Sequence, residues 1–302
     1  MKEKVLITGA SGALAKRVKT KLEQEGYEVV ALTTRRALAN EKTTFLWDIS
    51  RNYIDDKAFL DCDHIVHLSG FSIVKPWSKK NKQLMYDSRV KAADLLFKYC
   101  TSLKLKIKTF VTASALGYYG MDAVGLQTED NPAGNDWLAK MCVDWEQSAS
   151  AFENLGVRVV KMRISLLLAK DAGFLQPTML SMRFGVGVVF GSGKQAIEWM
   201  HIDDAANFVT FALGDKSVSG PYNMANNQRL NQAEFMRVIK SKVAPYAFMF
   251  HLPSFMLKLI FGSRSIILEG GVALSNEKLR NTTFESKYPS LESAIDKILS
   301  NE

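Results

Sequence analysis

Two glycines near the start of the chain stand where an apolar run gives way to a helix-compatible stretch. Val5-Leu6-Ile7 has the pattern of a strand buried on both faces of a parallel sheet, and Thr8-Gly9-Ala10-Ser11-Gly12 follows it directly. There Gly9 permits a tight turn, and Gly12 lets the backbone approach a pyrophosphate that the next helix N-terminus favours. The spacing is G-x-x-G-x-x-A, in place of the usual G-x-G-x-x-G. We predict a phosphate cradle formed by Gly9, Ser11, Gly12, Ala13 and Leu14.

The end of the second predicted strand carries Thr33, Arg35 and Arg36 and no carboxylate. Residues at this position, about 20 residues beyond the glycine turn, contact the adenosine ribose of a bound dinucleotide. A carboxylate would repel a 2′-phosphate, whereas arginine binds phosphate in a bidentate manner. The pattern favours NADP over NAD, unless the arginines are only solvated surface charge. Asp48, at the end of the third strand, would either accept from the adenine amino group or cap a turn.

Short apolar runs alternate with helical patterns along the first half of the chain. Helices are predicted from residue 13 to 22, 88 to 99 and 136 to 153, and later over 231–242 and 290–299. Strands alternating with helices at this spacing require crossovers and a parallel sheet. The predicted fold is α/β, a doubly wound Rossmann-type parallel sheet with a small C-terminal α/β domain on the substrate side. We expect the cofactor-binding domain at 1–220, with a substrate-side loop at 170–200, and a capping domain at 221–302. The predicted strands are 5–7, 27–32, 45–48, 64–70, 109–114 and 157–164.

The composition is that of an ordinary globular enzyme, with 47% hydrophobic and 23% charged residues. The net charge of +8 is spread over many segments, so no nucleic-acid partner is expected. The apolar stretch 248–261 is interrupted by His251, Pro253 and Lys258, so no membrane span or membrane partner is expected. Three scattered cysteines predict neither disulfides nor a metal site. We expect a reduced, cytoplasmic protein.

A series of later motifs completes a family pattern. They are the T-G-A-S-G-A-L turn, Leu68-Ser69-Gly70, Pro76-Trp77, Asp87-Ser88-Arg89, Ser114 to Gly120, Cys142-Val143-Asp144-Trp145-Glu146, Gly191 to Gln195, Trp199 to Asp204 and Tyr288 to Glu292. With these the chain resembles the atypical extended short-chain dehydrogenase/reductases, in the NAD-dependent epimerase/dehydratase-like subgroup typified by bacterial YfcH-type proteins. The resemblance implies a Rossmann-type NADP-binding domain and a small C-terminal domain that closes a cleft. Homodimers are common in this superfamily, although no surface stripe here argues for one.

The chain departs from the superfamily in the residues that transfer protons. Members of the superfamily use a Tyr followed four residues later by a Lys, and those positions fall on Leu138 and Cys142. Two functions therefore stay open. One is an oxidoreductase or epimerase-like enzyme that exchanges hydride with a small carbonyl or sugar-like substrate. The other is a non-catalytic sensor or regulatory protein that binds NADP(H).

The resemblance places further side chains around the site. Ser114, after the fifth strand, would position the substrate oxygen, and Tyr118 or Tyr119 could bring a phenol to the nicotinamide or merely pack the loop. Leu68, Ser69 and Gly70 would line the cofactor, and Arg89 would meet either the pyrophosphate or an internal carboxylate such as Asp48. His201 is a titratable candidate for which a structural role at a helix start is the alternative. The residues expected to contact substrate are Trp77, Arg163, Gln195, Trp199 and His201.

Overall fold

The computed structural model describes residues 2–40, 42–170 and 172–300. By its contacts the chain divides into two compact units, each assembled from separate stretches of sequence. Unit 1 comprises 1–115, 140–163 and 205–222, and unit 2 comprises 116–139, 164–204 and 223–302. This division differs from a single break after residue 220, because the loops that leave the sheet after residues 115 and 163 pack with the C-terminal part.

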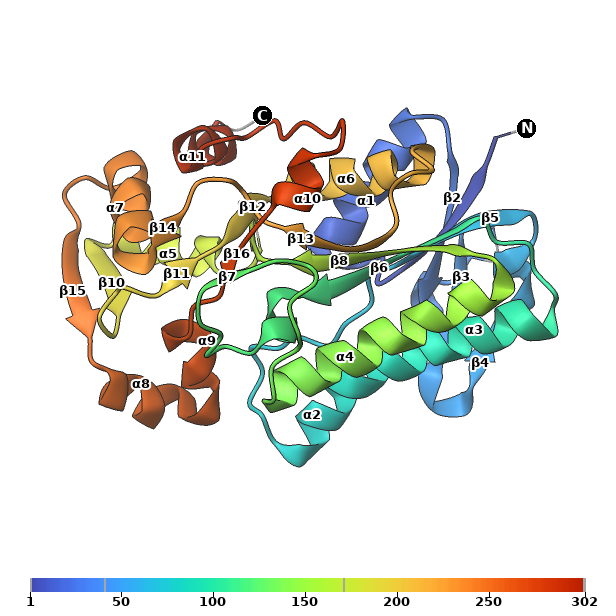
Figure 1. Cartoon of the computed structure of the whole chain (residues 1–302), viewed down its shortest axis with the longest axis horizontal. Helices are drawn as coiled ribbons and strands as arrows, with labels where there is room; N and C mark the ends of the chain where they lie inside the picture. Colours follow the sequence, from blue (N-terminus) through green and yellow to red (C-terminus); the bar gives the residue numbers. More distant parts are fainter. Residues whose placement is uncertain (1, 41, 171, 301–302) are drawn as a thin grey trace. The chain divides into compact units, whose positions relative to one another are not determined.

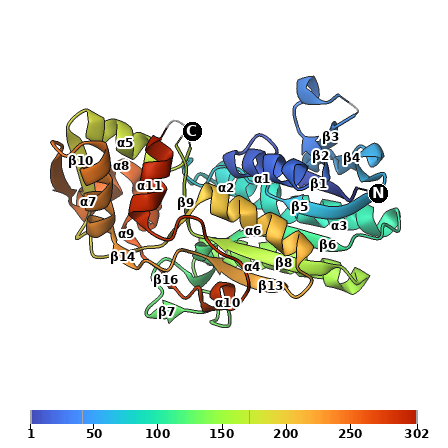
Figure 2. The ribbon, with the colours of Figure 1, turned by 90° about the horizontal axis from the view of Figure 1, so that it is seen from above.

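Unit 1 is built on an eight-stranded sheet of order β13-β8-β6-β5-β1-β2-β3-β4. Figures 1 and 2 show α1 and α6 on one face of this sheet and α3 and α4 on the other. The strands are β1 (Lys4–Thr8), β2 (Glu28–Thr33), β3 (Thr44–Asp48), β4 (Tyr53–Ile54), β5 (Cys62–His67), β6 (Thr109–Ala115), β8 (Arg158–Ile164) and β13 (Gly220–Met224). The helices are α1 (Ala13–Gln24), α2 (Lys79–Tyr86), α3 (Ala92–Ser102), α4 (Trp137–Ser150) and α6 (Ile202–Gly214). The doubly wound α/β fold predicted from the sequence is confirmed.

The strand order reverses at β1, which is the position that binds ligands in open α/β sheets. The pairs β3–β2, β2–β1, β1–β5 and β5–β6 are parallel, so their carboxyl ends lie at one edge. The chain winds outward from β1 to β3 on one side and from β5 to β6 on the other. A crevice forms outside the carboxyl ends at such a switch point. The glycine turn after β1 therefore lies where the sequence predicts the cofactor.

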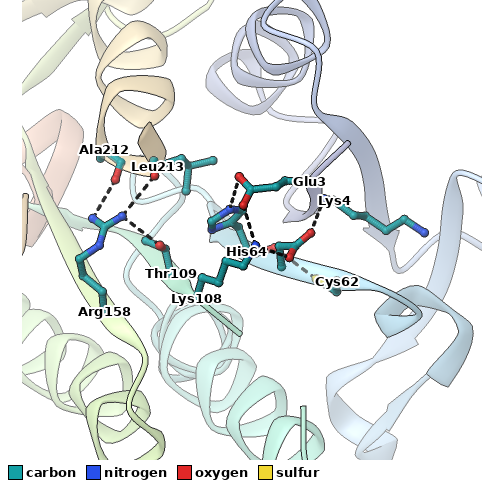
Figure 3. A network of polar contacts seen from close by, with 10 residues as sticks. Glu3, Lys4, Cys62, His64, Lys108, Thr109, Arg158, Ala212 and Leu213 are labelled. Atoms are coloured by element: carbon teal, nitrogen blue, oxygen red, sulfur yellow. Dashed lines mark hydrogen bonds and ion pairs between the residues drawn. The ribbon is translucent and has the colours of Figure 1, made fainter. Parts of the chain in front are cut away.

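An ion network stabilises the opposite, amino-terminal edge of this sheet (Figure 3). The Lys108 ammonium lies 2.6 Å from a Glu3 carboxylate oxygen and 2.8 Å from Asp63. Glu3 also reaches the Nε2 atom of buried His64 at 3.2 Å, and the Lys4 amide donates to Asp63 at 2.9 Å. The hydrogen bond from Lys108 lowers the pKa of Glu3. These contacts join the starts of β1, β5 and β6, far along each strand from the glycine turn.

Arg158 ties the first residue of β8 to the end of α6 at the same edge. Its guanidinium donates to the carbonyls of Ala212 at 2.8 Å and Leu213 at 3.3 Å, and to the Thr109 hydroxyl at 3.0 Å (Figure 3). The carbonyls in the last turn of a helix have no partner within the helix, and a cation there also meets the negative end of the helix dipole. Arg158 thus closes α6 and holds it against the strand starts.

Unit 2 combines short two-stranded pairs with helices around its own core. Parallel pairs form between β10 and β15, between β9 and β12 and between β7 and β16, and an antiparallel pair between β11 and β14. The strands are β7 (Leu126–Gln127), β9 (Leu166–Leu168), β10 (Val186–Phe190), β11 (Ala196–Ile197), β12 (Trp199–His201), β14 (Leu230–Asn231), β15 (Phe248–Leu252) and β16 (Ala273–Leu274). The helices are α5 (Leu175–Arg183), α7 (Gln232–Val243), α8 (Ser254–Phe261), α9 (Ser265–Glu269), α10 (Glu277–Arg280) and α11 (Leu291–Leu299). No helix in the described part of the chain is long and apolar enough to cross a bilayer.

The C-terminal tail of unit 2 is fixed by one buried carboxylate. Asp204, which is 0% exposed, accepts hydrogen bonds from the Ser286 hydroxyl and from the amides of Lys287 and Tyr288. Beyond this anchor, α11 begins with a capping box at Ser290, which satisfies amides that the helix itself leaves open. The tail is therefore an integral part of unit 2.

Candidate functional site

The turn after β1 requires glycine and ends on an open helix N-terminus. Gly9 has φ +69°, and a Cβ atom there would lie 2.6 Å from the Leu68 carbonyl oxygen. The Gly12 amide donates to the Gly9 carbonyl at 2.8 Å, and Gly12 is the N-cap of α1. It offers no side-chain cap, and the first turn of α1 holds no acidic residue. The first amides of α1 and the positive end of its dipole are therefore available to an anion.

A buried contact between a hydroxyl and an imidazole holds this turn against residues 68–70, the segment that follows β5, here called the exit of β5. The Thr8 Oγ1 atom accepts from the amides of Leu68 and Ser69, both at 3.1 Å, and lies 2.9 Å from the Nδ1 atom of His67. With both lone pairs used, the hydroxyl donates to Nδ1, so Nε2 carries the ring proton and donates to the Arg89 carbonyl at 3.1 Å. Burial lowers the pKa of His67 to about 4, so the ring is neutral at pH 7. From the sequence no role was predicted for His67, because its only sequence signal is its place in the predicted strand over 64–70.

The exit of β5 is also held by a π-helical turn at Asp87–Lys91, between α2 and α3. The Ser69 hydroxyl donates to the Ser88 carbonyl at 2.7 Å, and the Phe71 amide donates to the Ser88 hydroxyl at 2.7 Å. Single π turns inside helices occur frequently at functional sites. Here the turn directs Ser88 toward the loop that the resemblance assigns to the cofactor.

Arg89 of the same turn contacts backbone and an aromatic ring. Its guanidinium donates to the carbonyls of Phe71 and Met85, both at 3.0 Å, and its Cζ atom lies 5.2 Å from the Trp145 ring centroid. A Cβ atom on Gly70 would lie 3.0 Å from this guanidinium, which explains the glycine. Of the two partners expected for Arg89, the structure gives no contact with Asp48. Its guanidinium instead lies beside Gly70 and donates to the Phe71 carbonyl, at the exit of β5.

Two exposed arginines follow β2. The Thr33 hydroxyl accepts from the Arg35 amide at 3.1 Å and shapes this strand end. Within the described residues neither Arg35 nor Arg36 has a carboxylate partner, so both guanidinium groups can meet an anionic ligand. At the end of β3, Asp48 accepts from the Ser50 hydroxyl at 2.6 Å and caps the following turn. The hydrogen bonds, first that of Ser50, lower the pKa of Asp48. The turn-capping alternative for Asp48 is thus realised.

Ser114, at the end of β6, belongs to a buried ionic cluster. Its hydroxyl donates to Glu146 at 2.6 Å, and Arg163 binds the same carboxylate with two hydrogen bonds, of 2.9 and 3.0 Å. All three residues are less than 9% exposed. A serine hydroxyl has one hydrogen, so in this arrangement Ser114 can accept a hydrogen bond but cannot donate one to a carbonyl. Sequence reasoning placed Ser114 and Arg163 separately and missed the carboxylate that joins them.

The two positions that replace the Tyr/Lys pair lie buried on α4. Leu138 is 7% exposed and Cys142 is 2% exposed. Neither side chain offers a hydroxyl, phenol or ammonium group, so these positions of the helix supply no proton donor of the superfamily's kind.

The paired tyrosines belong to unit 2 and pack against each other, with ring centroids 5.3 Å apart. The Tyr119 hydroxyl is buried and donates to Asn223 at 2.7 Å. Asn223 in turn donates to the carbonyls of Gln127 and Ser275. Tyr119 is therefore part of a polar network inside unit 2, while Tyr118 remains half-buried.

The other predicted substrate residues either make contacts within their own unit or are buried in its core. Gln195 donates to two carbonyls of unit 2, Trp199 is completely buried, and Trp77 donates its indole N–H to the Ile73 carbonyl in unit 1. His201 accepts from the Asp203 amide at 3.1 Å at the start of α6, and its ring packs on Tyr288 with centroids 4.0 Å apart. This is the helix-start position considered for His201 from the sequence.

The predicted cofactor residues all fall in unit 1, whereas the predicted substrate residues divide between the units. In unit 1 the glycine turn, the β5 exit and Ser114 follow neighbouring strands in the order β1, β5, β6, and the arginines follow β2 on the other side. A dinucleotide lies across such a switch point. Among the described residues, no cluster of three or more His, Cys, Asp or Glu could hold a metal ion.

Comparisons with known proteins agree with this fold. A Staphylococcus aureus epimerase family protein is 28% identical over 301 residues, covering 98% of both chains. The crystal structure of the human epimerase family protein SDR39U1 (isoform 2), which contains NADPH, superposes with a TM-score of 0.87 at 25% identity over 99% of this chain and 100% of that one. A UDP-glucuronic acid 4-epimerase from Bacillus cereus shares the fold, with a TM-score of 0.77 at 18% identity over 97% and 96% of the two chains.

The sequence pattern of one family matches residues 5–225, which is most of unit 1 and part of unit 2. The resemblance inferred from the motifs is thereby confirmed, and the chain belongs to the NAD dependent epimerase/dehydratase family.

Proposed function

We propose that this protein binds NADP(H) and exchanges hydride with a small carbonyl or sugar-like substrate. The observation that carries the proposal is the open N-terminus of α1 behind the Gly9–Gly12 turn, in a unit whose β2 ends on two arginines without carboxylate partners in the described chain. The human relative that contains NADPH supports this choice of cofactor. NAD fits less well, because no carboxylate follows β2 to bind a free ribose 2′-hydroxyl.

The residues fit the cofactor in a defined order. The amides from Ser11 to Leu14 would hold the pyrophosphate, and Arg35 and Arg36 would hold the 2′-phosphate. Asp48, whose Oδ1 atom caps the turn after β3, would accept from the adenine amino group with its other carboxylate oxygen. Leu68, Ser69 and Gly70 would line the path between turn and nicotinamide, with Arg89 behind them. The bound nicotinamide would supply the hydride donor or acceptor.

Ser114 is the chain's group for orienting the substrate oxygen in this proposal. Because its hydrogen is held by Glu146, Ser114 would accept a hydrogen bond from a substrate hydroxyl, which favours the carbinol form of the substrate. The contact needs the side chains that cover Ser114 to move, since the residue is 2% exposed. Tyr118 or Tyr119 would supply the phenol that α4 lacks; for Tyr119 this means exchanging its bond to Asn223.

A second candidate is a non-catalytic NADP(H) sensor, and the buried Leu138 and Cys142 favour it. Calorimetric titration with NADPH, followed by a panel of carbonyl compounds and nucleotide sugars, separates the two. The enzyme proposal expects binding together with turnover that Ser114→Ala reduces while NADPH affinity is retained. Binding with no turnover on any substrate, and no effect of Ser114→Ala, would leave the sensor. Absence of NADPH binding would remove both.

A further inference from the structure

Helix α8 of unit 2 presents an apolar face to solvent. Phe255 is 70% exposed, Leu259 83%, Ile260 55% and Met256 38%, whereas Leu257 is completely buried. Residues four apart lie one above the other on a helix, so Phe255 with Leu259 and Met256 with Ile260 form one continuous face. An eight-residue helix attached through a single buried leucine leaves an unusual amount of apolar surface uncovered.

A second exposed apolar group lies at the start of β15, the strand that leads into α8. Phe248 is 71% exposed and pairs in register with Val186 of β10. Phe184, 80% exposed, ends α5, and the Phe248 amide donates to the Gly185 carbonyl next to it at 2.8 Å. We call the two groups together the apolar margin: Phe184, Tyr246, Phe248, Phe255, Met256, Leu259 and Ile260.

Both groups of the margin leave aromatic surface uncovered. An aromatic side chain has roughly 200 Å² of surface, so Phe184 and Phe248 together leave about 300 Å² uncovered, and Phe255 on α8 leaves about 140 Å². The largest apolar patch on a typical monomer measures about 300–600 Å² and is often functional. Figure 1 shows β15 and α8 consecutively along one end of unit 2, where no other helix or strand is drawn outside them.

The charge of the surrounding sequence indicates what covers this margin. Segments 172–197 and 235–268, which contain every margin residue, hold no Asp or Glu and have seven Lys or Arg. Three carboxylates, Glu198, Glu234 and Glu269, lie directly at the ends of these segments, so the two stretches with these residues included have a net charge of +4, which is half of the +8 of the whole chain. Lys258 lies on α8 itself, and Arg183 precedes Phe184, while Lys242 forms an ion pair with Asp296 of α11. Two copies meeting through this face would bring like charges together, which opposes a homodimer here.

We propose that the apolar margin docks on the anionic headgroup surface of a lipid bilayer, with α8 in the plane of the interface. Apolar residues on one helical face flanked by basic residues are the composition of interfacial helices, and juxtaposed Lys and Arg add electrostatic attraction to anionic lipid. The inference goes beyond the cofactor function and does not depend on it. It revises the expectation of no membrane partner, which rested on the lack of a segment able to span; α8 lies on the bilayer and does not cross it.

Vesicle co-sedimentation tests this directly. We expect the full-length protein to sediment with phosphatidylcholine vesicles that contain phosphatidylglycerol, to bind pure phosphatidylcholine far less, and to be released by salt. Leu259→Asp should weaken partitioning roughly tenfold or more. Lys258→Glu changes the charge by two units and should weaken partitioning roughly 25-fold, because each unit of charge near an anionic surface is worth about fivefold. Leu60→Asp, an exposed leucine of unit 1, is the matched control and should bind as wild type.

The proposal fails if the protein does not sediment with anionic vesicles, or if Leu259→Asp and Leu60→Asp bind these vesicles equally well. It also fails if light scattering finds a dimer that Leu259→Asp dissociates, because a second copy then covers the margin. An unchanged thermal midpoint will confirm that the variants are folded. Should Leu259→Asp unfold, Lys258→Glu decides alone, since an exposed lysine can be replaced without loss of core contacts.

Discussion

Replacing Arg163 by methionine will destabilise the protein far more than removal of an ordinary ion pair. Arg163 and Glu146 have side chains that are 3% and 8% exposed, and two hydrogen bonds of 2.9 and 3.0 Å join them. Arg163→Met leaves the Glu146 carboxylate buried with only the Ser114 hydroxyl against it. An uncompensated buried charge costs about 3–5 kcal/mol, which corresponds to a fall of roughly 10 °C in the thermal midpoint.

The measurement is thermal and urea unfolding of the two single variants Arg163→Met and Glu146→Leu, the double variant Glu146→Leu/Arg163→Met and a control. Replacing both buried charges by apolar residues is often neutral or stabilising, so the double variant should be more stable than Arg163→Met alone. Lys19→Met breaks an exposed pair with Glu23 and should cost less than about 1 kcal/mol. If Arg163→Met costs no more than Lys19→Met, or if the double variant loses the sum of both single losses, the cluster is not a buried charge pair.

Three further predictions follow from the backbone of the turn and from two buried titratable groups. Gly9→Ala should abolish NADPH binding in calorimetry. It should also cost clearly more stability than Gly26→Ala, because a Cβ atom on Gly9 would meet the Leu68 carbonyl. Gly26 also has a positive φ but lies in open space, so Gly26→Ala should cost only the backbone strain, about 1–2 kcal/mol. Burial lowers the pKa of His67 to about 4 from an unfolded value near 6.5, so the unfolded state binds more protons between these values, and about 3 kcal/mol of stability should be lost as the pH falls from 6.5 to 4. His67→Gln should flatten that slope in urea titrations. Burial raises the pKa of Glu198 to about 7, so the stability that protonation gives is complete below about pH 4.5 and is lost as the pH rises through 7; Glu198→Gln should therefore raise the thermal midpoint at pH 8 and not at pH 4.5.

Local sequence patterns were sufficient for the central strands of unit 1 but not for α2, α6, β4 and β13, which the sequence did not predict. The apolar runs at β1, β2 and β6 are properties of neighbouring residues, so the sequence predicted each of these strands to within one residue at either end, whereas the strand predicted over 64–70 ends at His67 as β5. The π turn at Asp87–Lys91 was not predicted, because its sequence reads as ordinary helix.

The contacts of the site residues were much less predictable. Ser114 and Glu146 are 32 residues apart and Thr8 and His67 are 59 apart, and no local pattern couples such distant side chains. The short strand pairs of unit 2 were missed for the same reason, since segments of two or three residues such as β9 and β12 become strands only through each other. The glycines and prolines that mark loops there gave no indication of which loops pair.

Calorimetric titration of the wild-type protein with NADPH and NADH tests the central claim most directly, together with Arg35→Ala and, as a matched control from unit 2, Arg183→Ala. We predict tighter binding of NADPH than of NADH. Arg35→Ala should weaken NADPH about 10- to 100-fold, as expected for a lost charge-assisted hydrogen bond to the 2′-phosphate, and leave NADH nearly unchanged; Arg183→Ala should alter neither. Equal losses for both nucleotides, or no loss for either, would contradict the account.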